Sequence, residues 1–287
     1  MVIRPELFAK VNPMWHLALE TIGLSGSVAL FKDTQLVANF ALPSQIGSAR
    51  SLLPAVNQIV REASITSSDL GLISLANGPG SFTGLRVSVA SAKAIGYALN
   101  VPLCPVDTLE TLAYRLGCAA STDTTKPILI AAAMDAYRKQ VFRLVALVEP
   151  VTAPATSGLH DVKLHVLIPS HHLDVALWKQ NPFHGLEAAT AQWQLPVKWD
   201  PAVNSGQQTV IVGGNAIARY PFADDLQKAL THSDPTDITA VDVGRYAWRQ
   251  WLAGTRTDPF HLLPNYLRAS AAEEKVSSVA SNDSPAV

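Results

Sequence analysis

The sequence predicts an α/β fold in which mixed sheets are flanked by helices. Short apolar runs typical of strands alternate with longer stretches whose apolar residues recur at helical spacing. A glycine-rich turn joins a predicted strand to a predicted helix twice, at residues 77–84 and 213–215. The 287 residues, 48% of them hydrophobic, are enough for one large or two modest domains with a substantial core.

The first half of the chain is predicted to begin with three strands joined by tight turns, at residues 16–21, 27–31 and 36–42. The elements that follow are a helix at 48–63, a strand at 70–76, a helix at 85–99 and a strand at 102–106. This order is that of a ribonuclease-H-like domain. A further helix begins at Asp107, with Glu110 at the spacing of a capping box.

The second half also begins with a predicted hairpin, whose strands span 128–134 and 140–148. Residues 149–207 contain many prolines and are predicted to be irregular. A strand at 209–212 leads into the second glycine-rich turn, and a helix at 239–253 follows, with an aspartate at capping-box spacing. Because each half begins with a hairpin and carries a glycine turn before a helix, the two halves are expected to share one topology.

The segment from Asn77 to Arg86 is the most informative in the chain. Its glycines and proline predict an unusual backbone path, and the turn ends at a helix N-terminus, where an anionic partner is favoured. No Gly-Lys-Ser/Thr follows, so it is not a Walker A loop, and most glycine-rich turns only make the turn. Ser81 and Thr83 most naturally cap the helix. The candidate signature-loop residues are Gly78, Pro79, Gly80, Ser81, Phe82, Thr83, Gly84 and Arg86.

This segment resembles the GPGSFTGLR signature of the TsaB (YeaZ) family of bacterial tRNA threonylcarbamoyladenosine biosynthesis proteins. That family lies in the Gcp/Kae1-like branch of the actin-like ATPase (ASKHA) superfamily. Four further segments resemble the family in the family's order, at residues 17–21, 51–54, 132–136 and 264–268. The resemblance covers most of the chain from about residue 16 to 268, but 150–207 matches poorly.

The resemblance implies two ribonuclease-H-like domains. The implied division is an N-terminal extension at 1–14, a first domain at 15–118 plus 237–254, a divergent second domain at 119–236, and a tail at 270–287. The tail is rich in Ala, Ser, Glu and Asn and is expected to be disordered.

The resemblance also implies a function. The chain would be a non-catalytic accessory subunit that supports TsaD in forming threonylcarbamoyladenosine at position 37 of tRNAs that read ANN codons. TsaD and the ATPase TsaE would be its partners, with a homodimer possible, and tRNA would be engaged only through the complex. The chain would bind no cofactor itself, because the metal belongs to TsaD and the ATP to TsaE.

Two helices are the candidate partner interface, since the family pairs the corresponding helices with TsaD or a second TsaB. Small residues recur at every fourth position of the later helix, which permits close helix approach. The alternative is that both helices pack on their own sheet. The candidate interface residues are Leu53, Val56, Val60, Leu85, Ser88, Val89, Ala92 and Gly96.

A small-molecule kinase or ATPase of the same superfamily is the alternative function. Its possible nucleotide cleft would contain Glu20, Gly23, Asp135 and Gly213. Three departures from the family pattern bear on these sites: Glu20 stands where the family usually has Asp, Ser48 where it commonly has His, and Tyr137 where it usually has Arg. Since Glu reaches one methylene further, a Mg²⁺ site built for Asp would be displaced. Nucleotide binding is therefore doubtful.

Composition bounds the remaining possibilities. No two of the eight histidines are four residues apart, so no helical metal pair is expected and the histidines are predicted to lie at the surface. The two cysteines, Cys104 and Cys118, are expected to be reduced thiols.

A net charge of −1 argues against autonomous, non-specific binding to nucleic acid. No membrane span or secretory signal is expected, which favours a cytoplasmic protein.

Overall fold

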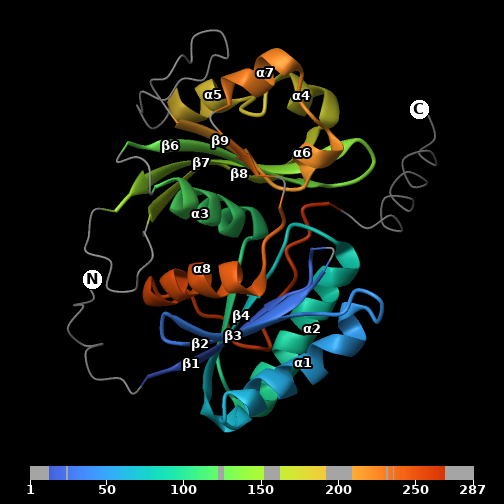
Figure 1. The fold of residues 1–287 in the computed structure, drawn as a ribbon, viewed down its shortest axis with the longest axis vertical. Helices are drawn as coiled ribbons and strands as arrows, with labels where there is room; N and C mark the ends of the chain where they lie inside the picture. The colour runs from blue at the N-terminus through green and yellow to red at the C-terminus, as the bar shows by residue number, and fades with distance from the viewer. Residues whose placement is uncertain are drawn as a thin grey trace, which may run out of the picture.

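The structure is a computed structural model that describes residues 13–23, 25–121, 126–151, 162–191, 209–230, 232–234 and 236–268. Its elements form stacked layers, in which two sheets enclose a pair of helices and carry further helices on their outer faces (Figure 1). The predicted extension, except for residues 13 and 14, and the predicted tail lie outside the described residues.

The first sheet has five strands in the order β3-β2-β1-β4-β5. The strands are β1 (Trp15–Glu20), β2 (Ser27–Lys32), β3 (Gln35–Ala41), β4 (Leu70–Ala76) and β5 (Leu103–Val106). The first three are antiparallel neighbours, and β4 and β5 run parallel to β1. Helices cover both faces around β4, which explains why its sequence is almost continuously apolar.

The second sheet repeats this topology with the order β8-β7-β6-β9-β10. The strands are β6 (Ile128–Asp135), β7 (Gln140–Pro150), β8 (Val162–Asp174), β9 (Thr209–Gly213) and β10 (His232–Asp234). Again the three strands that come first along the chain are antiparallel and the other two run parallel to the first. The predicted α/β class with two mixed sheets, and the shared topology of the two halves, are confirmed.

The helices are divided between the two outer faces and the space between the sheets (Figure 1). On the outer face of the first sheet lie α1 (Ser48–Glu62) and α2 (Phe82–Leu99). Between the sheets, α8 (Ala240–Leu252) packs on the first sheet and α3 (Thr108–Ala120) on the second. The outer face of the second sheet carries the short helices α4 (Val175–Gln180), α5 (Leu186–Ala191), α6 (Ala216–Arg219) and α7 (Asp224–Ala229).

One continuous hydrophobic core runs from the first sheet through α8 and α3 to the inner face of the second sheet. The strand β6 shows how the second sheet separates this core from a smaller one. Its residues Ile128, Ile130 and Ala132 belong to the continuous core, whereas the alternate residues Leu129 and Ala131 face the outer helices. The second, smaller core includes the fully buried Trp178 of α4.

Most predicted elements of both halves are confirmed within two residues of their expected ends. The predicted helix at 85–99 begins three residues earlier, at Phe82, so part of the predicted signature loop is helical. The predicted capping box at Asp107 is only half present. Asp107 accepts from the backbone N–H groups of Leu109 and Glu110, but the Glu110 carboxylate accepts instead from the hydroxyl of Tyr246 on α8, at 2.7 Å.

The prediction that residues 149–207 are irregular was wrong for the described part of that region. It contains the 13-residue strand β8 and the helices α4 and α5. The alternation of β8 is interrupted, because its pairing with β7 shifts register at Arg143/Val145 and at Val145/Ala146. Pro169 also lies within the strand. Pro is normally confined to edge strands of a sheet, and β8 lies at one edge of this sheet.

Among the described residues, no helix is both long and apolar enough to cross a membrane.

Candidate functional site

The signature loop ends in a well-formed helix start. Ser81 is the N-cap of α2, and its hydroxyl accepts from the N–H of Gly84 at 3.3 Å, as predicted. Thr83 lies exposed in the first turn of the helix. The bond between Gly78 and Pro79 is cis.

Two glycines of the loop allow it to lie directly against the end of β1. A Cβ atom at Gly84 would be 2.0 Å from the carbonyl oxygen of Thr21, whose hydroxyl donates to the Gly84 carbonyl at 2.7 Å. Gly80, with φ of +154°, faces Ile22, and a Cβ there would be 1.9 Å from Ile22 Cγ2. Only glycine fits at such distances, so these residues have a packing role whatever else the loop does.

The loop is also joined to a segment near residue 265. The Asn265 N–H donates to the Asn77 carbonyl at 3.0 Å, and the Asn77 amide donates to the Leu263 carbonyl at 3.1 Å. The rings of Phe82 and Tyr266 stack with centroids 4.8 Å apart. The signature and the segment at 264–268, two of the five stretches that resemble the family, are therefore neighbours in space.

Arg86 extends this junction through its side chain. Its guanidinium lies 4.0 Å from the Phe82 ring centroid, and its Nε donates to the Tyr266 hydroxyl at 3.3 Å. The side chain is exposed, so its charge remains accessible to solvent.

Two cavities adjoin the signature loop. The first, of about 530 Å³, lies between the loop, the turn that joins β6 to β7, and the segment at 265–268. The second, of about 560 Å³, is lined by Ile22, Gly23, Met134, Asn215 and Arg219 among others. Ser81, Asp135 and Tyr137 line both cavities, so these residues lie between them. Each volume is in the range of small-molecule sites.

Asp135 fixes the turn between β6 and β7. Its carboxylate lies 3.1 Å from Arg219 Nε, and it accepts from the Tyr220 hydroxyl and the Tyr137 N–H. The turn residues Tyr137, Arg138 and Lys139 all have positive φ, between 52° and 61°. Asp135 therefore pins the hairpin formed by β6 and β7.

Glu20 is engaged with its own backbone. The side chain is fully buried, and Oε1 accepts from the N–H groups of Ile22 and Gly23. Burial raises the pKa of this carboxyl to about 7, and the nearby Asp237 and Asp242 add to the rise, while the two backbone hydrogen bonds oppose it. Within the described residues Oε2 has no hydrogen-bond partner.

The predicted nucleotide cleft is only partly assembled. Gly23 and Asp135 line the second cavity, but Glu20 and Gly213 line neither. Gly213 packs inside the protein, where a Cβ atom would be 2.3 Å from Leu116 Cδ1. Sequence reasoning missed the arginines that do line the cavities, Arg138 and Arg219, because their neighbours along the chain form no recognisable motif.

The predicted interface requires correction. Of its eight side chains only Leu53 is exposed, by 50%. The other seven are buried within the chain: Val56, Val60, Leu85, Ser88, Val89, Ala92 and Gly96. A Cβ atom at Gly96 would be 2.7 Å from Leu103 Cδ2, so the small-residue stripe brings α2 close to β5 of the same chain. The exposed outer face of α2 is formed by Thr83, Arg86, Ala90, Ala94, Tyr97 and Ala98.

One histidine also departs from prediction. His16 is completely buried, Nε2 lies 2.6 Å from Ser74 Oγ, and burial lowers its pKa to about 3. Its neighbours are the rings of Phe31 and Trp248. Within the part of the chain that the structure describes, no three His, Cys, Asp or Glu side chains are grouped to hold a metal ion.

Comparison with known proteins identifies relatives of this chain. Residues 44–160 match the family model described as TsaD, tRNA N6-adenosine threonylcarbamoyltransferase. The TsaB protein of Bacillus subtilis is 27% identical over 168 residues, which are 58% of this chain and 64% of that protein. The TsaB protein of Escherichia coli is 31% identical over 126 residues, 44% of this chain and 52% of that protein. The matched regions thus span between half and two thirds of these relatives.

Two solved structures have a fold similar to that of this chain. A Pseudomonas aeruginosa protein described as similar to peptidase YEAZ has a TM-score of 0.63 at 21% identity, with 89% of this chain and 100% of that chain covered. YeaZ from the same organism has a TM-score of 0.60, also at 21% identity, with 88% and 100% covered. These matches define an α/β protein with the two-sheet fold of YeaZ and a sequence related to TsaD. Within that class, the sequence is similar to the TsaB proteins of Bacillus subtilis and Escherichia coli over part of their length.

Proposed function

We propose that this chain acts in the threonylcarbamoyladenosine modification of tRNA as a non-catalytic accessory subunit of TsaD. The similarity of the sequence to TsaB proteins and to the TsaD family model supports a role in this process. The observation that carries the subunit role is the placement of α1 and α2, which lie together on the outer face of the first sheet (Figure 1). Their outward side includes the exposed Leu53 and the small exposed residues Ala90 and Ala94.

The finer parts of this proposal concern partners and compartment. TsaD would bind the outer face of α1 and α2, and TsaE would join the resulting complex, with a homodimer through the same face as an alternative state. The metal and the ATP would belong to TsaD and TsaE, and the chain would act in the cytoplasm. The proposed domain division is 15–118 plus 237–254 and 119–236, although the hydrophobic core is continuous across it.

The alternative of a small-molecule kinase or ATPase is less well supported, because only Gly23 and Asp135 of its predicted cleft line the second cavity. Its acidic residue Glu20 is buried and accepts from its own backbone. Its glycine turn at Gly213 packs against α3. The accessory role is therefore the better-supported proposal.

Co-purification with TsaD from the same organism, followed by size-exclusion chromatography with light scattering, tests the subunit role. Gly96→Leu is unsuitable as a probe because Gly96 packs inside the chain. Ala94→Arg on the exposed face of α2 is expected to abolish the mixed complex, because a bulky charge there blocks helix approach. Ala188→Arg, on the exposed side of α5, is the matched control and should leave it intact. A complex that survives Ala94→Arg, or no complex with the unaltered chain, would contradict the proposal.

A further inference from the structure

The first cavity beside the signature loop concentrates positive charge on a protein that is nearly neutral. Arg86, Arg138 and Arg268 line it, together with one acidic residue, Asp135. The lining therefore carries a formal charge of +2, from three arginines and one aspartate, whereas the whole chain carries −1. Asp135 is moreover held by Arg219, which lines the other cavity and not this one. The cavity is thus chemically suited to an anionic ligand.

The same cavity presents aromatic surface. Tyr137, 55% exposed, and Tyr266, 40% exposed, both line it. The Tyr266 ring stacks on Phe82, and the Arg86 guanidinium lies over the Phe82 ring. A supported ring of this kind, with solvent-accessible area, is a surface on which a planar base can stack.

The third contribution comes from the backbone. Ser81, Phe82 and Thr83, at the beginning of the 18-residue helix α2, line the cavity. The N-terminus of a helix of this length carries partial positive charge, which adds to the field of the three arginines. The positions of Arg86 and Arg268 are fixed by hydrogen bonds to Tyr266 and to the Ala136 carbonyl, so two of the cations are preorganised.

We propose that this cavity binds a nucleotide, with the base against Tyr266 and Tyr137 and the phosphate held by the arginines. An inorganic anion would use the arginines but not the rings, and an apolar peptide would leave three guanidinium groups desolvated. The site shares only Asp135 with the cleft predicted from sequence, since Glu20, Gly23 and Gly213 do not line it. It requires no partner subunit, so it goes beyond the accessory role and stands independently of it.

The nucleotide has two possible sources, a single-stranded RNA or a free nucleotide. Fluorescence anisotropy of the full chain with a labelled ten-nucleotide single-stranded RNA measures the first, and calorimetry with AMP measures the second. If the chain binds the RNA and AMP does not displace it, the ligand of the site is an RNA strand. If the chain binds AMP in the absence of RNA, the ligand is a free nucleotide. Binding of neither probe at low salt would overturn the proposal.

Two variants locate the binding in this cavity. Arg138→Gln removes a charge and should weaken binding of the probe about tenfold, as expected for a lost charge-assisted hydrogen bond. Tyr266→Leu should weaken it roughly fivefold or more, whereas Tyr266→Phe, which keeps the ring, should bind nearly as well as the unaltered chain.

The matched controls are Arg61→Gln on α1 and Tyr97→Leu on α2, both exposed and outside the cavity. Both should bind as the unaltered chain does, and melting temperatures of all variants identify any that fail to fold. If Arg138→Gln and Tyr266→Leu both bind the probe as tightly as the unaltered chain does, the proposed location of the site is wrong. Displacement of the probe by inorganic phosphate as effectively as by AMP would overturn the role of the base.

Discussion

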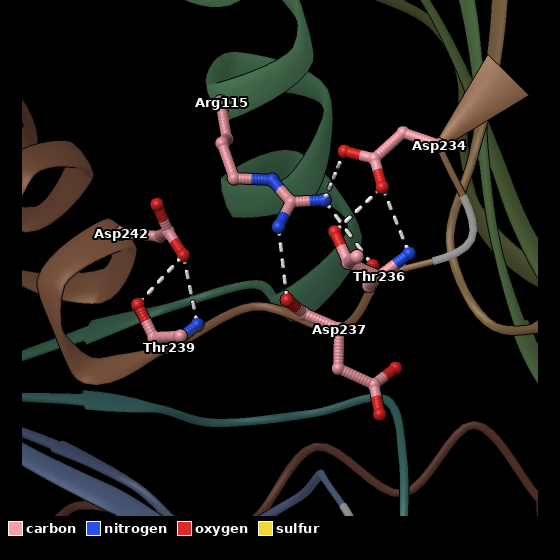
Figure 2. A network of polar contacts seen from close by, with 6 residues as sticks. All are labelled: Arg115, Asp234, Thr236, Asp237, Thr239 and Asp242. Carbon is pink, nitrogen blue, oxygen red and sulfur yellow. Dashed lines mark hydrogen bonds and ion pairs between the residues drawn. The ribbon is translucent and has the colours of Figure 1, made fainter. Parts of the chain in front are cut away.

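Arg115 on α3 lies 3.1 Å from Asp234 at the end of β10, through Nη2 and Oδ2 (Figure 2). The same guanidinium donates to the backbone carbonyls of Thr236 and Asp237. These contacts hold the segment through which the chain returns from the second sheet to α8. Two residues later, Thr239 and Asp242 form the capping box that begins α8 (Figure 2).

Arg115→Met should therefore lower the free energy of unfolding by about 2 kcal/mol, because it removes three hydrogen bonds from a charged donor while keeping the aliphatic stem. Chemical denaturation measures the change. Arg61→Met, at an exposed position on α1, is the control and should change stability by less than about 0.5 kcal/mol. Equal stability of the two variants would show that the return segment does not depend on Arg115.

Asp242→Ala should cost about 1 kcal/mol, the usual value of a helix cap. The Asp242 carboxylate accepts from both the N–H and the hydroxyl of Thr239, at 2.8 Å each. Hydrogen exchange should show the loss as faster opening of the first turn of α8. Asp242→Asn keeps an acceptor oxygen, so the amides of the first turn of α8 should remain largely protected from hydrogen exchange. Equal exchange rates at these amides in Asp242→Ala and Asp242→Asn would argue against the cap.

Glu20 should make stability depend on pH. Its pKa is raised from 4.5 to about 7, so the folded state holds the proton more tightly than the unfolded state. The free energy of unfolding should therefore fall as pH rises from about 4.5 to about 7 and then level off. Glu20→Gln cannot ionise, so its stability relative to the unaltered chain should improve across that window by up to about 3 kcal/mol. A difference between the two proteins that stays constant from pH 5 to pH 8 would contradict the raised pKa.

Gly84→Ala should destabilise the protein by about 3 kcal/mol, because the added methyl would meet the Thr21 carbonyl at the junction of α2 and β1. Gly23→Ala is the matched control. There the nearest atoms to an added Cβ are 3.6 Å away, an ordinary contact, so the cost should be well below 1 kcal/mol. Thermal unfolding measures both changes. A similar melting temperature for Gly84→Ala and Gly23→Ala would show that Gly84 is not required for packing against β1.

Local sequence patterns predicted the fold because the hydrophobic periodicity, the turn glycines and the helix caps indicate the same elements along most of the chain. They failed at β8, where bulged pairing and Pro169 hide the alternation. They also failed at the interface, because small residues at every fourth position indicate close packing without saying against what. At Gly96 the neighbour is Leu103, about which the helix sequence carries no information.

The candidate site illustrates the same limit. The resemblance identified the signature and the segment at 264–268 separately, and only the folded chain shows that Phe82 stacks on Tyr266, 184 positions later. The cavity between them also uses Arg138, from a turn of the second sheet. Contacts between such distant segments depend on topology, which periodicity does not determine.

The central claim, an accessory role in tRNA modification, is tested most directly by reconstitution. TsaD and TsaE from the same organism are incubated with tRNA and the threonylcarbamoyl donor, with and without this chain, and the modified nucleoside is measured by mass spectrometry. We expect the nucleoside to form efficiently only when the chain is added, and none to form with the chain alone. Full activity without the chain, or modification by the chain alone, would contradict the account.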